Sequence, residues 1–205
     1  MAMTLRVVVP PHPLIGHWLT ILRTRSTPPP LYATGLEEIG RWLTYEALRE
    51  WLPHRKELVE TTQSETEGVL IESTVPIIAI PLLPGGLNLW NGGRKVLPNS
   101  DLCMNAVPQN IEKNAGVIIF IDQITTGEHL KKALSPLRKQ NVEPKRLRVI
   151  TALASSPGLT ELGNEYPELT IYTACIDPEL AENGEISPGI GNPIVRLNAR
   201  TTSPL

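Results

Sequence analysis

The sequence has little of what marks specialised protein classes. It contains one Phe, two Cys and no run of about 18 uninterrupted apolar residues, so no segment is expected to cross a membrane. The formal net charge of −2 excludes a strongly basic nucleic-acid binder and a disordered acidic chain. Gly (15) and Pro (20) stay below the roughly 25–30% typical of low-complexity or collagen-like chains. With a single Phe, the core must be built from Leu, Ile and Val.

Cysteine is too scarce for a disulfide framework. Cys103 and Cys175 lie far apart in the chain, and neither has a neighbouring Cys or His at metal-ligand spacing. We expect both thiols to be structural and the protein to be cytoplasmic, in a reducing compartment. Residues 1–9 lack the charged start, long apolar run and small-residue cleavage site of a secretory signal, so none is expected.

The remaining composition, 41% apolar and 20% charged, is that of an ordinary globular protein. A chain of 205 residues without repeats or an obvious linker predicts one domain over residues 1–205. Short β-rich runs alternate with helical patterns, which predicts an α/β fold with a mainly parallel sheet. The expected strands are residues 5–9, 77–80, 116–121, 148–154 and 169–176.

The helix and loop signals are less uniform. Thr34 followed by Glu37 predicts a capping box, and the helix behind it should end before Pro53. A second helix after residue 127 contains Pro136, which should kink or shorten it. The remaining expectations are a polar surface loop over 60–68, a turn over 84–86 and irregular structure over 91–115.

The distribution of charged residues and the four tryptophans each allow two interpretations. Residues 151–195 carry seven acids and no Lys or Arg, whereas residues 131–148 are rich in basic side chains. These are two solvated faces of opposite sign or a docking surface for a partner. The four Trp residues are candidates either for a partner surface or for core packing; they are Trp18, Trp42, Trp51 and Trp90.

One segment carries a pattern suited to chemistry. The apolar strand 116–121 is followed by Asp122, then by Thr125, Thr126 and Gly127, and then by a helix. Loops at the carboxyl ends of parallel strands bind ligands, and backbone N–H groups at a helix start can surround an anion. Taken alone, these residues fit a phosphate site and an ordinary strand-to-helix turn equally well.

A family resemblance favours the phosphate site. Residues 118–122 with 125–127 resemble the phosphoribosyl-pyrophosphate (PRPP) loop of type I phosphoribosyltransferases. Within that group the chain resembles uracil phosphoribosyltransferase over nearly its whole length. The other matching pieces are His12-Pro13-Leu14, residues 43–47, Ile80–Leu83 with Gly85–Leu87, Tyr172–Asp177, Asn183-Gly184 and Pro188–Gly191.

The resemblance implies a type I phosphoribosyltransferase-like fold, a mainly parallel sheet flanked by helices, whose N- and C-terminal segments form a hood. It implies a homodimer or a subunit of a larger assembly that binds uracil, a nucleotide or phosphate, with no nucleic acid. It also implies Mg²⁺ only if transferase activity is retained, and it indicates no catalytic side chain. The implied site residues are Asp122, Thr125, Thr126 and Gly127 for PRPP, Pro84, Gly85 and Gly86 for the pyrophosphate loop, and Ile176, Gly189, Ile190 and Gly191 for the base.

The sequence departs from the family pattern at several positions of the implied site. Pro84 stands where the family has an arginine, and Glu128 and His129 follow Gly127 in place of a glycine and a small hydroxyl residue. Glu128 would repel a phosphate by roughly 1 kcal/mol in water and about 4 kcal/mol at an effective dielectric near 20. Asn192-Pro193 replaces an acidic, glycine-containing turn, and the segment after Asp101 predicts that the family's extended arm is shortened or absent.

These departures favour the hypothesis of a family member that kept the fold and lost most catalysis. Such a protein would be non-catalytic or weakly active and would act as a binding, regulatory or assembly subunit. The alternative is an active uracil phosphoribosyltransferase that makes UMP and pyrophosphate from uracil and PRPP. A third hypothesis is a different base or phosphoribosyl substrate.

Overall fold

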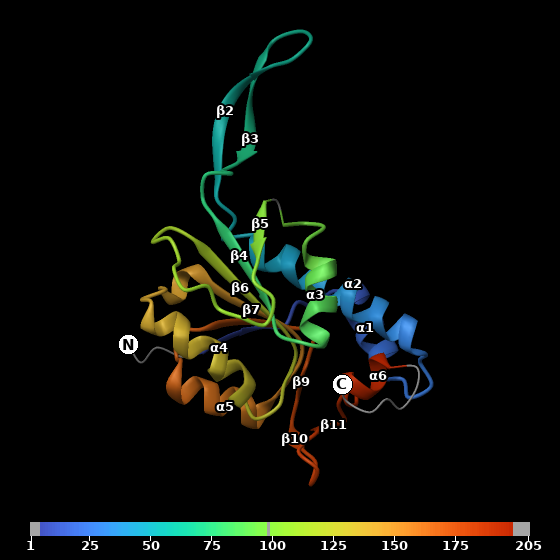
Figure 1. Ribbon diagram of the computed structural model, residues 1–205. Helices are drawn as coiled ribbons and strands as arrows, with labels where there is room; N and C mark the ends of the chain where they lie inside the picture. The colour runs from blue at the N-terminus through green and yellow to red at the C-terminus, as the bar shows by residue number, and fades with distance from the viewer. Residues whose placement is uncertain (1–4, 98, 199–205) are drawn as a thin grey trace.

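The protein is described by a computed structural model that covers residues 5–97 and 99–198; the ends of the predicted domain and Pro98 lie outside the described residues. Its centre is a parallel seven-stranded sheet (Figure 1). This confirms the predicted α/β fold with a mainly parallel sheet. The strand order is β1 (Arg6–Val8), β8 (Thr170–Thr173), β7 (Leu147–Ser155), β6 (Gly116–Ile124), β4 (Ile77–Pro81) and β5 (Ser100–Leu102), with β9 (Ile176–Asp177) beside the end of β7.

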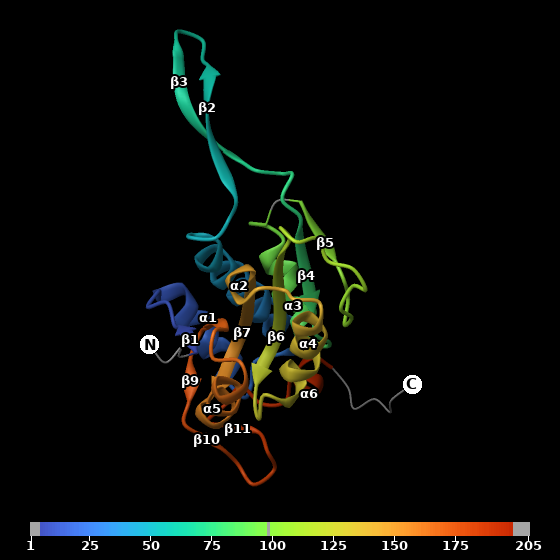
Figure 2. The ribbon, with the colours of Figure 1, turned by 90° about the vertical axis from the view of Figure 1, so that its left-hand side faces the viewer.

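Helices cover both faces of the sheet (Figures 1 and 2). One face packs against α1 (Pro13–Arg23), α2 (Pro29–Leu48), α3 (Gly85–Gly93) and α6 (Pro193–Leu197), and the other against α4 (Glu128–Lys139) and α5 (Ser156–Glu165). A 3-10 turn, Pro144–Arg146, leads into β7. Because the central strands are covered on both sides, they are continuous apolar runs, as in β6, where residues 116–121 are all buried.

The loops that matter for function meet at one edge of the sheet. Strands β4, β6 and β7 are parallel, and each leads from its carboxyl end into a helix, α3, α4 and α5 respectively. A short antiparallel hairpin, β10 (Glu179–Leu180) and β11 (Ile186–Ser187), follows β9 beyond the same edge. Residues distant in sequence therefore come together there, where open α/β sheets place their ligands.

An arm projects from the opposite end of the molecule (Figure 2). It is a long antiparallel hairpin of β2 (His54–Glu60) and β3 (Glu65–Ile71), paired from His54 with Ile71 to Glu60 with Glu65. The prediction of a surface loop over residues 60–68 was therefore wrong. The segment after Asp101 is short as expected, since it holds only the end of β5 and a loop to β6, but the arm just described arises earlier in the chain.

Three local predictions also need correction. Helix α2 begins at Pro29, and the Thr34 hydroxyl donates to the Pro30 carbonyl oxygen (3.0 Å) from within the helix. Helix α4 continues through Pro136 to Lys139. Gly85 and Gly86 form the first turn of α3, and Trp90 of that helix is buried in the core.

Within residues 5–97 and 99–198, no helix is both long and apolar enough to cross a membrane. Both cysteines are partly buried free thiols.

Candidate functional site

Asp122 lies against the first turn of α3. Its Oδ2 accepts a hydrogen bond from the Gly85 N–H (3.2 Å), and its Oδ1 accepts one from the Gln123 N–H (2.7 Å). Burial raises the pKa of the Asp122 carboxyl, while these backbone donors and the nearby charge of His129 act in the opposite direction. The candidate pyrophosphate loop and the candidate ribose-binding carboxylate, 37 residues apart in sequence, are thus in direct contact.

The start of α3 requires glycine because it presses against β6. A Cβ on Gly86 would lie 2.3 Å from the Phe120 carbonyl oxygen, which also accepts the Leu82 N–H (2.8 Å). Pro84 occupies the N-cap position of α3 and contributes neither an N–H donor nor a positive charge. Residues 84–86 therefore contribute backbone groups, but no cationic side chain, at the carboxyl end of β4.

The segment from Thr125 to Gly127 is fixed from behind by the start of α5. The Ser155 hydroxyl donates to the Thr125 carbonyl oxygen (2.5 Å) and accepts from the Gly158 N–H (3.0 Å), capping α5. Gly127 is the N-cap of α4 and has φ +84°, a conformation that favours glycine. Thr126 is exposed, so the loop offers a hydroxyl outward from a rigid support.

Glu128 does not stand alone at this loop. Its carboxylate pairs with Lys131 (3.2 Å), whose Nζ also lies 3.7 Å from Glu161 and 3.5 Å from Glu165 on α5. The Glu128 side chain is largely exposed, so water and Lys131 both weaken its field. The repulsion expected from the sequence is therefore smaller than for an unpaired carboxylate.

The candidate base-binding residues form a loop supported from α1. Gly189 has φ +67°, its N–H donates to Asp177 Oδ2 (2.9 Å), and its carbonyl oxygen accepts from Arg23 (3.0 Å). Arg23 also donates to both carboxylate oxygens of Asp177, at 2.8 and 2.6 Å. Burial opposes ionisation of Asp177, but the hydrogen bonds from Arg23 and Gly189 outweigh it and lower its pKa.

Arg196 supports the same loop from the C-terminal side. It donates to the carbonyl oxygens of Ile190 (3.3 Å) and Thr24 (2.8 Å), and its guanidinium lies 4.6 Å from the centre of the Tyr32 ring. The Tyr32 hydroxyl is buried and has no hydrogen-bond partner among the described residues. The base loop is thus held by Arg23 of α1 and Arg196 of α6, and Arg196 in turn packs on Tyr32 of α2.

The Gln123 side chain joins the base loop to β6, the strand that carries Asp122. Gln123 Nε2 donates to the Gly191 carbonyl oxygen at 3.5 Å, the long end of hydrogen-bond distance. The structure thereby brings Asp122, residues 84–86 and residues 189–191 to one place. Ile190 is buried within this loop, whereas Ile176 is 38% exposed on the neighbouring β9.

Reasoning from the sequence did not single out Gln123, Arg23 or Arg196. Each has a carbonyl or carboxylate partner far away in the chain, and no local pattern marks such a partner. Asp177 lies within a segment quoted for the family resemblance, but its contact with Arg23 spans 154 positions. In the folded protein Asp177 is buried, and its burial identifies it as a residue that needs a partner.

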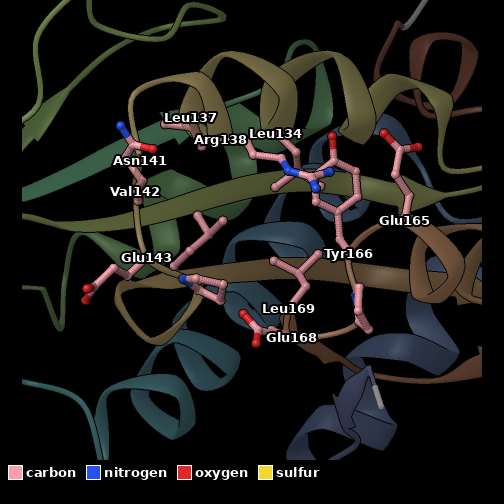
Figure 3. A pocket seen from close by; sticks show the side chains of 13 residues that line it. Leu134, Leu137, Arg138, Asn141, Val142, Glu143, Glu165, Tyr166, Glu168 and Leu169 are labelled. Carbon is pink, nitrogen blue, oxygen red and sulfur yellow. The ribbon is translucent and has the colours of Figure 1, made fainter. Parts of the chain in front are cut away.

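A cavity of about 490 Å³ lies elsewhere, between the second half of α4 and the end of α5 (Figure 3). Leu134 and Leu137 of α4 line it, together with Leu147 at the start of β7 and Leu169 just before β8. The Arg138 guanidinium lies 5.7 Å from the centre of the Tyr166 ring, and Glu143, Glu165 and Glu168 also line the cavity. None of the site residues predicted from the sequence lines this cavity. We therefore place the candidate site at the carboxyl ends of the strands, where the predicted site residues converge, and not in this cavity.

Comparison with known proteins assigns the family. The family model described as "Uracil phosphoribosyltransferase" matches residues 9–196, nearly the whole chain. The chain belongs to the uracil phosphoribosyltransferase family. The matched range contains every candidate site residue at the carboxyl edge of the sheet, from residue 84 to residue 191.

Relatives within this family match nearly the full length of the chain. A uracil phosphoribosyltransferase of Synechococcus elongatus is 39% identical, covering 96% of this chain and 98% of that protein. One from Nostoc is 36% identical, covering 94% and 96%. Among solved structures, the AQ2163 protein of Aquifex aeolicus superposes with a TM-score of 0.82 at 26% identity, covering 96% of this chain and all of that one. The fold is thus of the phosphoribosyltransferase type.

The donors at the site do not fit a resident metal ion. Within residues 5–97 and 99–198, no group of three or more His, Cys, Asp or Glu side chains could hold one. Asp122 lies three residues before the phosphate loop, and each of its carboxylate oxygens already accepts a hydrogen bond from a backbone N–H group.

Proposed function

We propose that the protein is an active uracil phosphoribosyltransferase that joins uracil to the ribose of PRPP and releases pyrophosphate. The observation that carries this proposal is the link from the base loop through Gln123 to the strand end at Asp122, where the candidate phosphate loops also lie. The curated relatives support it, because those that match nearly the full length are named as this enzyme. They favour the active enzyme over the non-catalytic subunit first hypothesised from the sequence.

Each candidate segment has a separate role in this proposal. Asp122 accepts hydrogen bonds from the ribose hydroxyls, since each of its oxygens keeps acceptor capacity beyond one backbone bond. The loop from Thr125 to Gly127 surrounds the 5′-phosphate with backbone N–H groups and the Thr126 hydroxyl. Residues 84–86 face the pyrophosphate, and residues 189–191 with Ile176 hold the base by main-chain groups.

The proposed catalysis rests on positioning. No nucleophilic side chain is assigned, so rate acceleration would come from holding uracil beside the ribose carbon and stabilising the departing pyrophosphate. Mg²⁺ would arrive with PRPP, held by the phosphates themselves. The α1 and C-terminal segments would form the hood above the base, an arrangement that the contacts of Arg23 and Arg196 support.

A non-catalytic subunit is the second candidate, favoured by Pro84 in place of a cation and by the Asn192-Pro193 turn. The test is UMP formation from labelled uracil, PRPP and Mg²⁺ by the purified protein. Turnover within the usual range of about 1–10³ s⁻¹ is the expected result. Absence of UMP, together with calorimetric binding of UMP, would favour the binding subunit, and turnover of another base would favour the third hypothesis.

We also propose a homodimer in which the β2–β3 arm lies on a second copy of the chain. The arm exposes apolar side chains, with Leu58 70%, Val69 63% and Ile71 41% exposed. A two-stranded hairpin is at best marginally stable in water without a covering surface. Light scattering should give twice the mass of 22.6 kDa, and replacing residues 55–71 by a short turn should give the monomer. The two free thiols support a cytoplasmic location.

A further inference from the structure

A second cavity, of about 350 Å³, lies beside the candidate pyrophosphate loop. Strand β4 and the chain just after it contribute its wall with Ile80 and Leu82, and the loop that follows β5 contributes a second wall. Asn105 of that loop accepts the Leu83 N–H through its Oδ1 (3.4 Å). The cavity therefore borders the segment that leads directly into Pro84. The remaining lining residues are Ala106, Val107, His129, Lys132, Ala133 and Pro136.

The charge of this cavity has one sign. His129 and Lys132 stand three residues apart on α4, so their side chains share one face of the helix. No acidic residue is among the described residues that line the cavity. The neighbouring acid, Glu128, pairs with Lys131, and no ion pair is made by His129 or Lys132 within residues 5–97 and 99–198. Two potential donors thus face a space without a counter-charge.

One of these two side chains, His129, acts electrostatically on the candidate ribose-binding carboxylate. Burial raises the pKa of the Asp122 carboxyl, and the nearby charge of His129 partly opposes this effect. Asp122 in turn accepts the Gly85 N–H, the residue after Pro84. The cavity, the pyrophosphate loop and the ribose-binding carboxylate are therefore neighbours.

We propose that this cavity is an anion subsite in which Lys132 and His129 bind a phosphate or pyrophosphate group. The proposal rests on the proposed function, because it supplies the positive charge that Pro84 cannot bring to the departing pyrophosphate. Lys132 contributes a compact ammonium with three donors, and His129 contributes an imidazole N–H. The side-chain amide nitrogen of Asn105 keeps its donor capacity, since its oxygen makes the contact with Leu83.

Calorimetric titration with sodium pyrophosphate, and separately with inorganic phosphate, tests the subsite without turnover. Lys132→Gln should weaken binding of the anion about tenfold or more, as expected for loss of a hydrogen bond to a charged group. His129→Gln should weaken it less, because one amide N–H can replace one imidazole N–H. Lys139→Gln is the matched control: it removes the same charge from the same helix outside the cavity and should leave binding unchanged.

Two further measurements distinguish the possible sources of the anion. If the site takes the diphosphate of PRPP, Lys132→Gln raises the KM for PRPP and not that for uracil, and pyrophosphate competes with PRPP. If it takes free phosphate, phosphate binding depends on Lys132 while PRPP binding does not. Equal affinities of the Lys132 and Lys139 variants, or no binding of either anion to the unaltered protein, overturns the subsite. Anion binding through Lys132 without UMP formation would defeat the proposed function and leave the subsite standing.

Discussion

The Gly85 N–H donates to the Asp122 carboxylate, and the contact is so close that a Cβ on Gly85 would lie 2.5 Å from the Asp122 Cβ and 2.6 Å from its Oδ2. Any side chain at position 85 must push the loop away from β6 or displace the carboxylate. This contact makes the candidate pyrophosphate loop and the candidate ribose-binding carboxylate one rigid unit. A change at one position should therefore affect the binding of both parts of PRPP.

Gly85→Ala should lower kcat/KM for PRPP by about a hundredfold, because loop and carboxylate separate by more than the tolerance of a well-positioned reaction. Overpacking should also cost about 1–3 kcal/mol of folding free energy. Steady-state kinetics and urea unfolding measure the two effects. Gly16→Ala is the control, since its Cβ would meet nothing within 4 Å in α1 and should keep full activity. An active Gly85→Ala enzyme would contradict the assigned contact.

Asp177→Asn should lower the free energy of unfolding by about 3 kcal/mol at neutral pH, because it leaves Arg23 without its buried counter-charge. The folded-state pKa of Asp177 is lowered, while the unfolded chain keeps the ordinary value of about 3.9. Its stabilising effect is therefore complete above that pH and is lost as pH falls through the folded-state value. The variant should show a shallower loss of stability between neutral and acid pH, measured by urea unfolding.

The control for this pH dependence is Glu182→Gln, an exposed acid in the turn between β10 and β11. It should leave the stability curve unchanged. Parallel curves for the Asp177 variant and the unaltered protein would mean that the Arg23 contact does not hold the carboxylate ionised.

Arg196→Met should raise the KM for uracil about tenfold and change the KM for PRPP little, because the Ile190 carbonyl and its loop lose a charged donor. Arg196→Lys should recover part of the loss. Arg138→Met is a matched control, since that guanidinium also lies over a tyrosine ring, Tyr166, but outside the site. Equal effects of the Arg196 and Arg138 variants on uracil binding would refute a role for Arg196 in the base loop.

Glu128→Gln should change phosphate affinity by less than about threefold, because an exposed and paired carboxylate has a weak field. Glu161→Gln, which removes another partner of Lys131, serves as its control. Calorimetry with UMP gives the comparison. A tenfold tighter binding by the Glu128 variant would restore the repulsion inferred from the sequence alone.

Local apolar patterns predicted the centre of the fold well. Strands β4, β6 and β7 are rich in apolar residues because both faces of the sheet are covered, so the sequence pattern of these strands reflects their burial. The β2–β3 arm was missed because nearly all of its residues are exposed and no apolar alternation marks a buried face. The start of α2 was misplaced because Thr34 turns its hydroxyl back to Pro30 within the helix, while three prolines already begin the first turn. Helices α1, α3, α5 and α6 were not predicted.

The candidate site was predictable in its backbone segments and not in its supports. Gly127 and Gly189 signal positive φ locally, and both have it. The contacts of Gly85 with Asp122 and of Gln123 with Gly191 depend on which strands become neighbours, information that no short segment contains. The i,i+3 spacing of Glu128 and Lys131 allows them to pair on one helix face, whereas the contacts of Lys131 with the acids of α5 depend on the fold.

The clamp of Arg23 on Asp177 and Gly189 has a consequence for how substrate preference could diverge within the family. The loop whose main-chain groups would read the pyrimidine is held in place through Gly189 by a side chain 166 positions earlier, at the end of the first helix. Mutations in that helix could therefore retune which nucleobase is accepted while every atom that meets it stays chemically the same.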